Sequence, residues 1–252
     1  MFKKLLFTFC LFVQTTVVFS QGGNVSSESI FAPVIGATYN FQVSGGDLSS
    51  RFGLNSAVGL MTDFKLKSQW ILGAEYNFMF GDQVRENSIL DNLLTSQDFV
   101  ITQAGQNGQI IMAERGHQLL FNLGRLFPVF GPNKNSGLVF KFGIGYLQHK
   151  IHIEFNSDQI PQLTGDYMKG YDRLTSGVML NQFFGYQNLS NSKLTNFFAG
   201  IQISEGFTKS RRSYNFDTME ADTRSRLDLL YSLRVGWILP IYKRAPKNYI
   251  PD

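Results

Sequence analysis

The chain has 252 residues, with 23 lysines and arginines against 19 aspartates and glutamates, so its formal net charge is +4. This near-balance, which falls to +2 when a leader containing Lys3 and Lys4 is removed, gives no indication of a nucleic-acid partner. Aromatic residues make up 14% of the chain but there is only one cysteine, so a disulfide scaffold is excluded.

Residues 1–20 have the pattern of a secretory signal peptide. Lys3 and Lys4 form a short basic start, residues 5–19 are mostly apolar and uncharged, and Ser20 is a small residue directly before Gln21. Cleavage is therefore expected near Ser20-Gln21. Cys10 lies in the middle of the apolar stretch rather than at its end, so lipidation is not expected and the mature chain has no thiolate for a metal site. No later segment has the length of uninterrupted apolar residues that a transmembrane helix needs.

Eight later segments alternate large apolar residues with small or polar ones, as the two-residue period of a β-strand requires. In the stretch WILGAEYNFMF, Trp70, Tyr76 and Phe80 share one face, while Glu75 and Asn77 share the other. The eight expected strands are residues 31–43, 52–64, 70–80, 117–127, 138–146, 174–186, 197–207 and 227–239.

The connections between these strands alternate in length. They are short after the second, fourth and sixth strands, and long after the third, fifth and seventh, where they span residues 81–116, 155–173 and 208–223. After Tyr146 the pattern of the fifth strand also shifts, because His152 carries on the parity that was apolar, which predicts either a bulge or an exit from the membrane. Short turns on one side and long loops on the other are typical of outer-membrane barrels.

The composition of the two faces indicates which one meets lipid. The small-and-polar face consists mainly of Gly, Ala, Asn, Ser, Thr and Gln, which suits the cramped interior of a small barrel better than a water-facing surface. Aromatic residues gather near both ends of the strands, as interfacial girdles do. We therefore predict an all-β fold: an eight-stranded antiparallel transmembrane β-barrel over residues 30–242, between a periplasmic segment 21–29 and a periplasmic tail 243–252.

At this level the chain resembles the small eight-stranded outer-membrane β-barrel proteins, most of all those of Bacteroidota-type bacteria, whose signal peptides often end in Ser-Gln. Residues 234–242, RVGWILPIY, resemble the last-strand signal that the barrel-assembly machinery reads. The resemblance implies insertion in the outer membrane of a Gram-negative cell, contact with outer-membrane lipid and loops at the cell surface. It implies no single activity.

Several charged residues are expected to point into the lumen. Because an eight-stranded barrel is filled by its own side chains, we interpret them as a structural ion network rather than as a proton or ion path. The predicted members are Asp63, Glu75, Arg125, Lys141, Arg226, Asp228 and Arg234.

The histidines do not indicate a catalytic or metal site. His149 and His152 are three residues apart on a strand and so lie on opposite faces, which spoils them as a joint chelate. His152 and Glu154 share a face near Ser157, but no G-x-S-x-G setting supports a nucleophile there. We expect solvated residues at the base of a loop, and predict no catalytic residue, metal or cofactor.

The longest loop, residues 81–116, carries more apolar material than a solvated loop needs. It contains a short helical pattern at 88–94 and a hairpin pattern, in which 99–101 and 110–112 flank Gln106-Asn107-Gly108. This material either caps the barrel mouth or docks on a partner. The residues proposed for partner contact are Ile89, Leu90, Leu93, Leu94, Tyr167 and Tyr171.

The sequence thus favours a non-enzymatic structural or accessory barrel that binds a partner through its extracellular loops, within a larger outer-membrane complex. The alternatives are a lipid-modifying enzyme of the deacylase or acyltransferase type and, third, a narrow pore.

Overall fold

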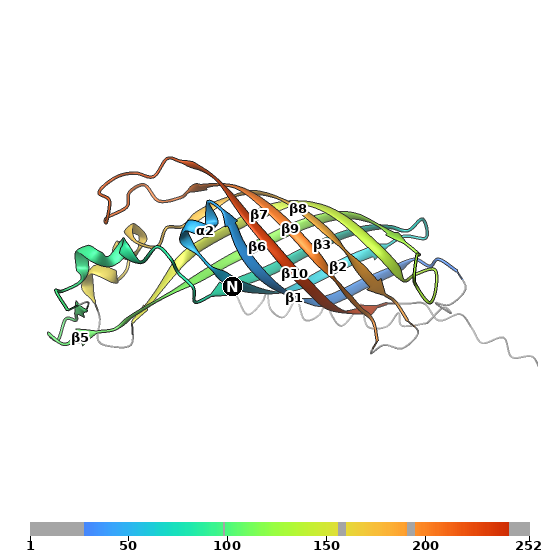
Figure 1. Cartoon of the computed structure of the whole chain (residues 1–252), viewed down its shortest axis with the longest axis horizontal. Helices are drawn as coiled ribbons and strands as arrows, with labels where there is room; N and C mark the ends of the chain where they lie inside the picture. The colour runs from blue at the N-terminus through green and yellow to red at the C-terminus, as the bar shows by residue number, and fades with distance from the viewer. Residues whose placement is uncertain (1–27, 98, 156–159, 191–194, 242–252) are drawn as a thin grey trace, which may run out of the picture.

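The computed structural model describes residues 28–97, 99–155, 160–190 and 195–241. Eight long antiparallel strands form a closed ring in the order β1-β10-β9-β8-β7-β6-β3-β2 (Figure 1). Pairing of β1 with β10 closes the ring, so the barrel has no open sheet edge. The predicted eight-stranded antiparallel barrel is confirmed. Its strands are β1 Ala32–Gly46, β2 Leu54–Lys65, β3 Trp70–Gly81, β6 Ile110–Phe127, β7 Gly137–Phe155, β8 Thr175–Asn188, β9 Phe197–Ser210 and β10 Ser225–Pro240.

The connections divide the barrel into two unlike ends. The links after β2, β6 and β8 are short and lie at one end, here called the turn end, where β1 also starts and β10 finishes (Figure 1). The opposite end, the loop end, carries the small elements. These are α2 Leu48–Arg51, η2 Asn87–Leu93, η3 Pro161–Leu163, η4 Tyr167–Gly170, and the hairpin of β4 Val100–Ile101 with β5 Asn107–Gly108.

The outer wall of the barrel is apolar. Along β10, Tyr231, Leu233 and Trp237 are exposed, whereas Ser232 and Arg234 between them are buried. The other strands alternate in the same way, so the large side chains point outward as predicted. A barrel surrounded by water would bury these side chains, so this wall suits a hydrocarbon environment. In the described part of the chain, no helix combines the length and the apolar character needed to cross a membrane.

The strands β6 and β7 extend furthest beyond their expected ranges. β6 begins at Ile110 and β7 continues to Phe155, and their pairing runs from one end to the other without interruption. His149 and Ile151 are buried while His152 points outward, so the inward parity of β7 is unchanged beyond Tyr146. Of the two alternatives that the sequence left open, the bulge is therefore wrong. The outward residues of β7 beyond Tyr146 are polar because β6 and β7 continue past the apolar band of the wall. Residues 110–112 belong to β6 rather than to the loop hairpin.

Phe52 lies inside the barrel mouth and not on the outer wall, where the alternation placed it. It follows α2, precedes β2 and is fully buried. Its ring packs edge-on against the ring of His149, with 5.7 Å between centroids. The helical turn α2, between β1 and β2, takes Phe52 out of the strand alternation and directs it inward.

The interior consists of three layers. An apolar cluster fills the loop end and includes Leu120, Leu147, Met179 and Leu230. A second apolar cluster fills the turn end, where Ile30 packs against it. Between the clusters lie buried polar side chains, which include Asn40, Glu75, Asn77, Gln118, Gln202 and Arg234. The lumen is packed, as expected for eight strands.

Candidate functional site at the barrel mouth

The long loops fold over the mouth and form a cap, defined here as the described residues between β3 and β6, between β7 and β8, and between β9 and β10. Ile89 and Leu90 of η2 are buried in the loop-end cluster, together with Leu163 and Tyr171 from the next loop. The Nδ2 atom of Asn92 donates to a backbone oxygen of the third loop at 3.2 Å. All three loops therefore contribute to a single packed cap.

This packing corrects most of the predicted partner contacts. Ile89, Leu90 and Tyr171 are buried, and Leu93 and Leu94 are half-buried against the same cluster. The helical pattern at 88–94 does form a 3-10 helix, but its apolar face covers the mouth of its own barrel. Of the six residues, Tyr167 alone has a largely exposed side chain, at 65%.

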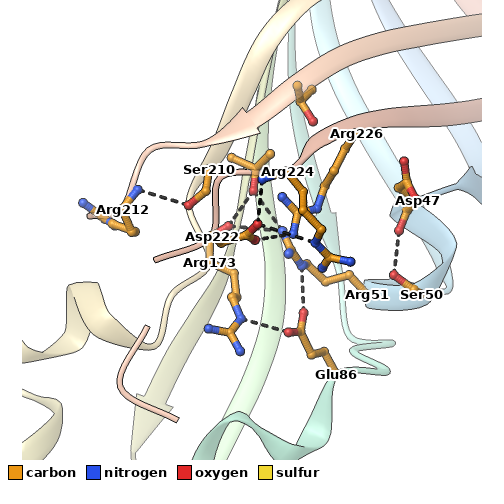
Figure 2. Close-up of polar contacts among 12 residues, drawn as sticks. Asp47, Ser50, Arg51, Glu86, Arg173, Ser210, Arg212, Asp222, Arg224 and Arg226 are labelled. Carbon is orange, nitrogen blue, oxygen red and sulfur yellow. Dashed lines mark hydrogen bonds and ion pairs between the residues drawn. The ribbon is translucent and has the colours of Figure 1, made fainter. Parts of the chain in front are cut away.

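A network of charged residues, here called the mouth cluster, joins the cap to the barrel rim (Figure 2). Glu86 accepts hydrogen bonds from the Nε atoms of Arg51 and Arg173, each at 2.8 Å. Arg173 also pairs with Asp217 at 2.5 Å, and Arg226 pairs with Asp222. The mouth cluster consists of Arg51, Glu86, Arg173, Asp217, Asp222 and Arg226. It links α2, the loop before η2, the start of β8 and the loop before β10.

The electrostatics of the cap favour the charged forms of Glu86 and Arg173. Burial alone would raise the pKa of Glu86, but the guanidinium groups of Arg51 and Arg173 outweigh burial and hold that pKa below its ordinary value. Burial alone would lower the pKa of Arg173, but its pairs with Asp217 and Glu86 raise it. The ion pairs are therefore intact at neutral pH and stabilise the closed cap.

A polar cavity of about 310 Å³ opens beside this network. Its lining alternates carboxylates and guanidinium groups, among them Glu86, Arg173, Asp222, Arg224 and Arg226. Because three carboxylates and three guanidinium groups line it, the cavity has no clear preference for an anion or a cation.

The predicted luminal charges form separate pairs rather than one network. Glu75 pairs with Arg234 at 2.5 Å, and Asp63 pairs with Lys141. Asp228 pairs with His149 at 2.9 Å, a partner that the sequence did not indicate. Arg226, also predicted as a luminal charge, lies at the mouth and pairs with Asp222.

Arg125 is not luminal, so its assignment to the interior is wrong. It is exposed on the outer wall, with its guanidinium carbon 5.5 Å from the ring centroid of Trp70 and 5.7 Å from that of Phe127. Its parity is that of Phe121 and Leu123, which also face outward. At the turn end a long side chain can reach the polar interface and cover an aromatic ring.

The histidines are arranged as the spacing predicts: His149 points inward and His152 outward. His152 contacts Glu154 at 2.8 Å, and Ser157 lies outside the described residues. His149 instead contacts Asp228, which accepts a hydrogen bond from Thr208 Oγ1 at 2.5 Å. The carboxylate thus stands between imidazole and hydroxyl, so His149 does not contact Thr208 as the base of a nucleophilic triad would.

Sequence reasoning missed most of the mouth cluster. Arg51, Glu86, Arg173, Asp217 and Asp222 all lie in connections, where the two-residue period gives no orientation. One local signal was available: Asp222 precedes Arg226 by four residues at the start of β10. The signal peptide 1–20, most of segment 21–29, Tyr242 and the tail 243–252 lie outside the described residues.

No family model and no curated protein matches the chain. Among solved structures, Neisserial surface protein A is 7% identical, with 82% of this chain and 96% of that chain covered and a TM-score of 0.45. Ail of Yersinia pestis, in complex with the heparin analogue sucrose octasulfate, is 8% identical, with coverages of 83% and 99% and a TM-score of 0.40.

The outer membrane protein OprG from Pseudomonas aeruginosa is 9% identical, with 86% and 99% covered and a TM-score of 0.38. These neighbours are small outer-membrane barrels, and they do not support the expected Bacteroidota-type origin. At such identities the likeness concerns the fold.

Proposed function

We propose that this chain is an integral outer-membrane protein whose closed, non-conducting barrel holds a preformed extracellular cap for contact with a protein partner. The apolar outer wall and the absence of an open sheet edge support the membrane location, because a spanning structure must satisfy its backbone hydrogen bonds internally. The expected signal peptide and the topology, with β1 starting and β10 finishing at the turn end, fit an orientation in which the loops face outward.

A scaffold role is favoured over a pore. The polar layer around Glu75 and Arg234 lies between the two apolar clusters that fill the ends of the barrel. Ile30 lies against the cluster at the turn end, and the cap covers the cluster at the loop end. An ion would have to displace packed side chains at both ends, so conduction is not the use that this interior suits.

The observation that carries the proposal is an aromatic surface on the cap. Tyr167 and Met219 are each 65% exposed and Tyr214 is 41% exposed. Phe216 lies between them, with its ring centroid 6.3 Å from that of Tyr167 and 6.0 Å from that of Tyr214. The buried ion pairs below hold this surface in place, and rigid exposed aromatic residues are favoured at protein interfaces.

Two experiments test the two parts of this proposal. If the barrel is inserted, the chain resists extraction from outer membranes by alkaline carbonate and changes its gel mobility on boiling; recovery as a free periplasmic protein would exclude insertion. For the cap, the tagged chain is purified from native membranes alongside a variant carrying Tyr167→Ser, Tyr214→Ser and Met219→Ser. A protein that copurifies with the wild type and not with the variant supports the proposal. Recovery of both chains as lone monomers would reject it.

A further inference from the structure

A row of unpaired cations crosses the outer wall just above the apolar band, toward the loop end. Arg115 on β6 is directly opposite Lys150 on β7, and both side chains point outward. His149 of β7 pairs with Thr175 of β8, and the backbone nitrogen of Arg211, directly after β9, donates to the oxygen of Leu174 at 2.8 Å, so Arg211 lies at a similar height two strands beyond Lys150, with Leu174 between them. Lys209, two residues earlier on β9, also points outward. We call Arg115, Lys150, Lys209 and Arg211 the outer basic row.

These four side chains have no ion-pair partner among the residues that the structure describes. Arg211 donates only to the hydroxyl and carbonyl oxygens of Ser176, and Arg115 only to a backbone oxygen. The outward carboxylate of Glu154 is bonded to His152. Like charges directly opposite each other on paired strands destabilise a sheet, so an anion bound between Arg115 and Lys150 would relieve their repulsion.

The row stands where the polar part of a lipid would lie. Tyr146, Val178 and Phe207 are paired across three strands and form an exposed apolar row. Lys150 follows Tyr146 by four residues, which is about 13 Å along a strand. A lipid whose acyl chains lie against Tyr146 and Val178 would therefore bring its headgroup phosphates to the level of Lys150 and Arg211.

A groove beside the row adds an apolar site with a polar rim. Because β6 and β7 extend past their neighbours, a depression of about 560 Å³ forms along β6. Its lining includes the apolar side chains of Phe41, Leu54 and Phe80 and the guanidinium group of Arg115. The acidic groups Asp82 and Glu154 also line it, so phosphate is expected on the side of Arg115 that faces Lys150.

We propose that the outer basic row binds the phosphate groups of an outer-leaflet glycolipid, whose acyl chains cover the apolar wall below. This inference rests on membrane insertion as proposed above. Guanidinium and ammonium groups bind phosphate through charge attraction and hydrogen bonds. The guanidinium groups of Arg115 and Arg211 can each donate to two phosphate oxygens at once.

The test uses the full chain purified in a non-ionic detergent and titrated with lipid A, which carries two phosphates, or with its enzymatically dephosphorylated form. Bound lipid is counted by native mass spectrometry. The variant Arg115→Gln/Lys150→Gln/Arg211→Gln is compared with Lys67→Gln/Arg125→Gln/Lys134→Gln, which removes the same charge at the turn end. Each basic residue near an anionic lipid is worth roughly fivefold in affinity, so the first variant should bind lipid A about a hundredfold more weakly.

The expected result is that lipid A binds more tightly than its dephosphorylated form. Only the variant Arg115→Gln/Lys150→Gln/Arg211→Gln should lose this difference in affinity. Equal binding of the two lipids, or equal losses in both variants, would overturn the assignment. Inorganic phosphate is the third probe: if it binds as tightly as lipid A, the row recognises a soluble anion and the lipid assignment is wrong. Gel mobility before and after boiling shows that each variant is folded, so failure of this site is distinct from failure of membrane insertion.

Discussion

Replacing Glu75 by leucine is expected to destabilise the barrel by about 3–5 kcal/mol, because the change leaves a buried guanidinium without its counter-charge. Glu75 Oε2 lies 2.5 Å from Arg234 Nη2, and the two side chains are only 2% and 4% exposed. The substitution also removes the hydrogen bond from Asn77 Nδ2 to Glu75 at 2.7 Å. Gln202 would remain as an acceptor for Arg234 but carries no charge.

The matched substitution is Tyr76→Leu, one residue along the same strand. Tyr76 is 47% exposed on the outer wall, and its hydroxyl group bonds His117 Nδ1 at 2.7 Å. Losing that bond should cost about 1 kcal/mol, since leucine keeps an apolar body toward lipid. Urea unfolding of both variants in lipid vesicles, followed by tryptophan fluorescence, measures the two losses. A larger loss for Tyr76→Leu would show that the apolar face is the inner one, which contradicts the membrane barrel.

Three further outcomes are expected. Because the pKa of Glu86 is lowered, its charge stabilises the cap above about pH 4, and this stabilisation is lost as the pH falls through the lowered pKa. Limited pepsin digestion should therefore cut the cap faster near pH 3 than near pH 5. The same pH dependence in Glu86→Gln would contradict this. A Cβ at Gly170 would overlap the ring of Phe216, so Gly170→Ala should increase cleavage of the cap while the boiling-dependent gel shift stays unchanged. Lys141→Met leaves Asp63 buried without its cation and should cost about 3 kcal/mol or more, whereas Arg125→Gln on the outer wall should change the unfolding free energy by less than about 1 kcal/mol; a larger effect for Arg125→Gln would return that residue to the interior.

The wall of the barrel could be predicted because side chains along each strand point alternately inward and outward, and the positions of the large apolar residues show which face is outward. The assignment of Arg125 to the lumen was wrong because its charge was given more weight than its position in the alternation. An arginine on the outer wall near the membrane surface can keep its guanidinium group in the polar layer. The assignment of Phe52 was wrong for a different reason: the alternation of β2 was extended back to the residue that directly follows α2, where the two-residue period does not apply.

The cap could not be predicted beyond its need to bury apolar residues. Whether Ile89 and Leu90 cover the mouth or face a partner depends on where three loops, distant in sequence, converge. The same holds for Glu86, whose partners Arg51 and Arg173 are 35 and 87 residues away along the chain. Local sequence patterns carry no information on such long-range contacts. In the loops there is also no two-residue alternation from which the orientation of a side chain could be predicted.

The luminal ion pairs raise the question of why charged residues are kept where apolar packing would often be at least as stable. Glu75–Arg234 joins β3 to β10 and Asp63–Lys141 joins β2 to β7, and the hydrogen-bonded pair of His149 and Asp228 joins β7 to β10. In each pair the two strands are three positions apart around the ring, so a shift in any strand register between them would separate the partners. The pairs therefore act against wrong closure of the barrel. If so, Glu75→Leu combined with Arg234→Met should recover most of the stability that Glu75→Leu loses, yet give doubled backbone amide signals by NMR; a single set of signals in the double variant would show that register is fixed by the strands and turns alone.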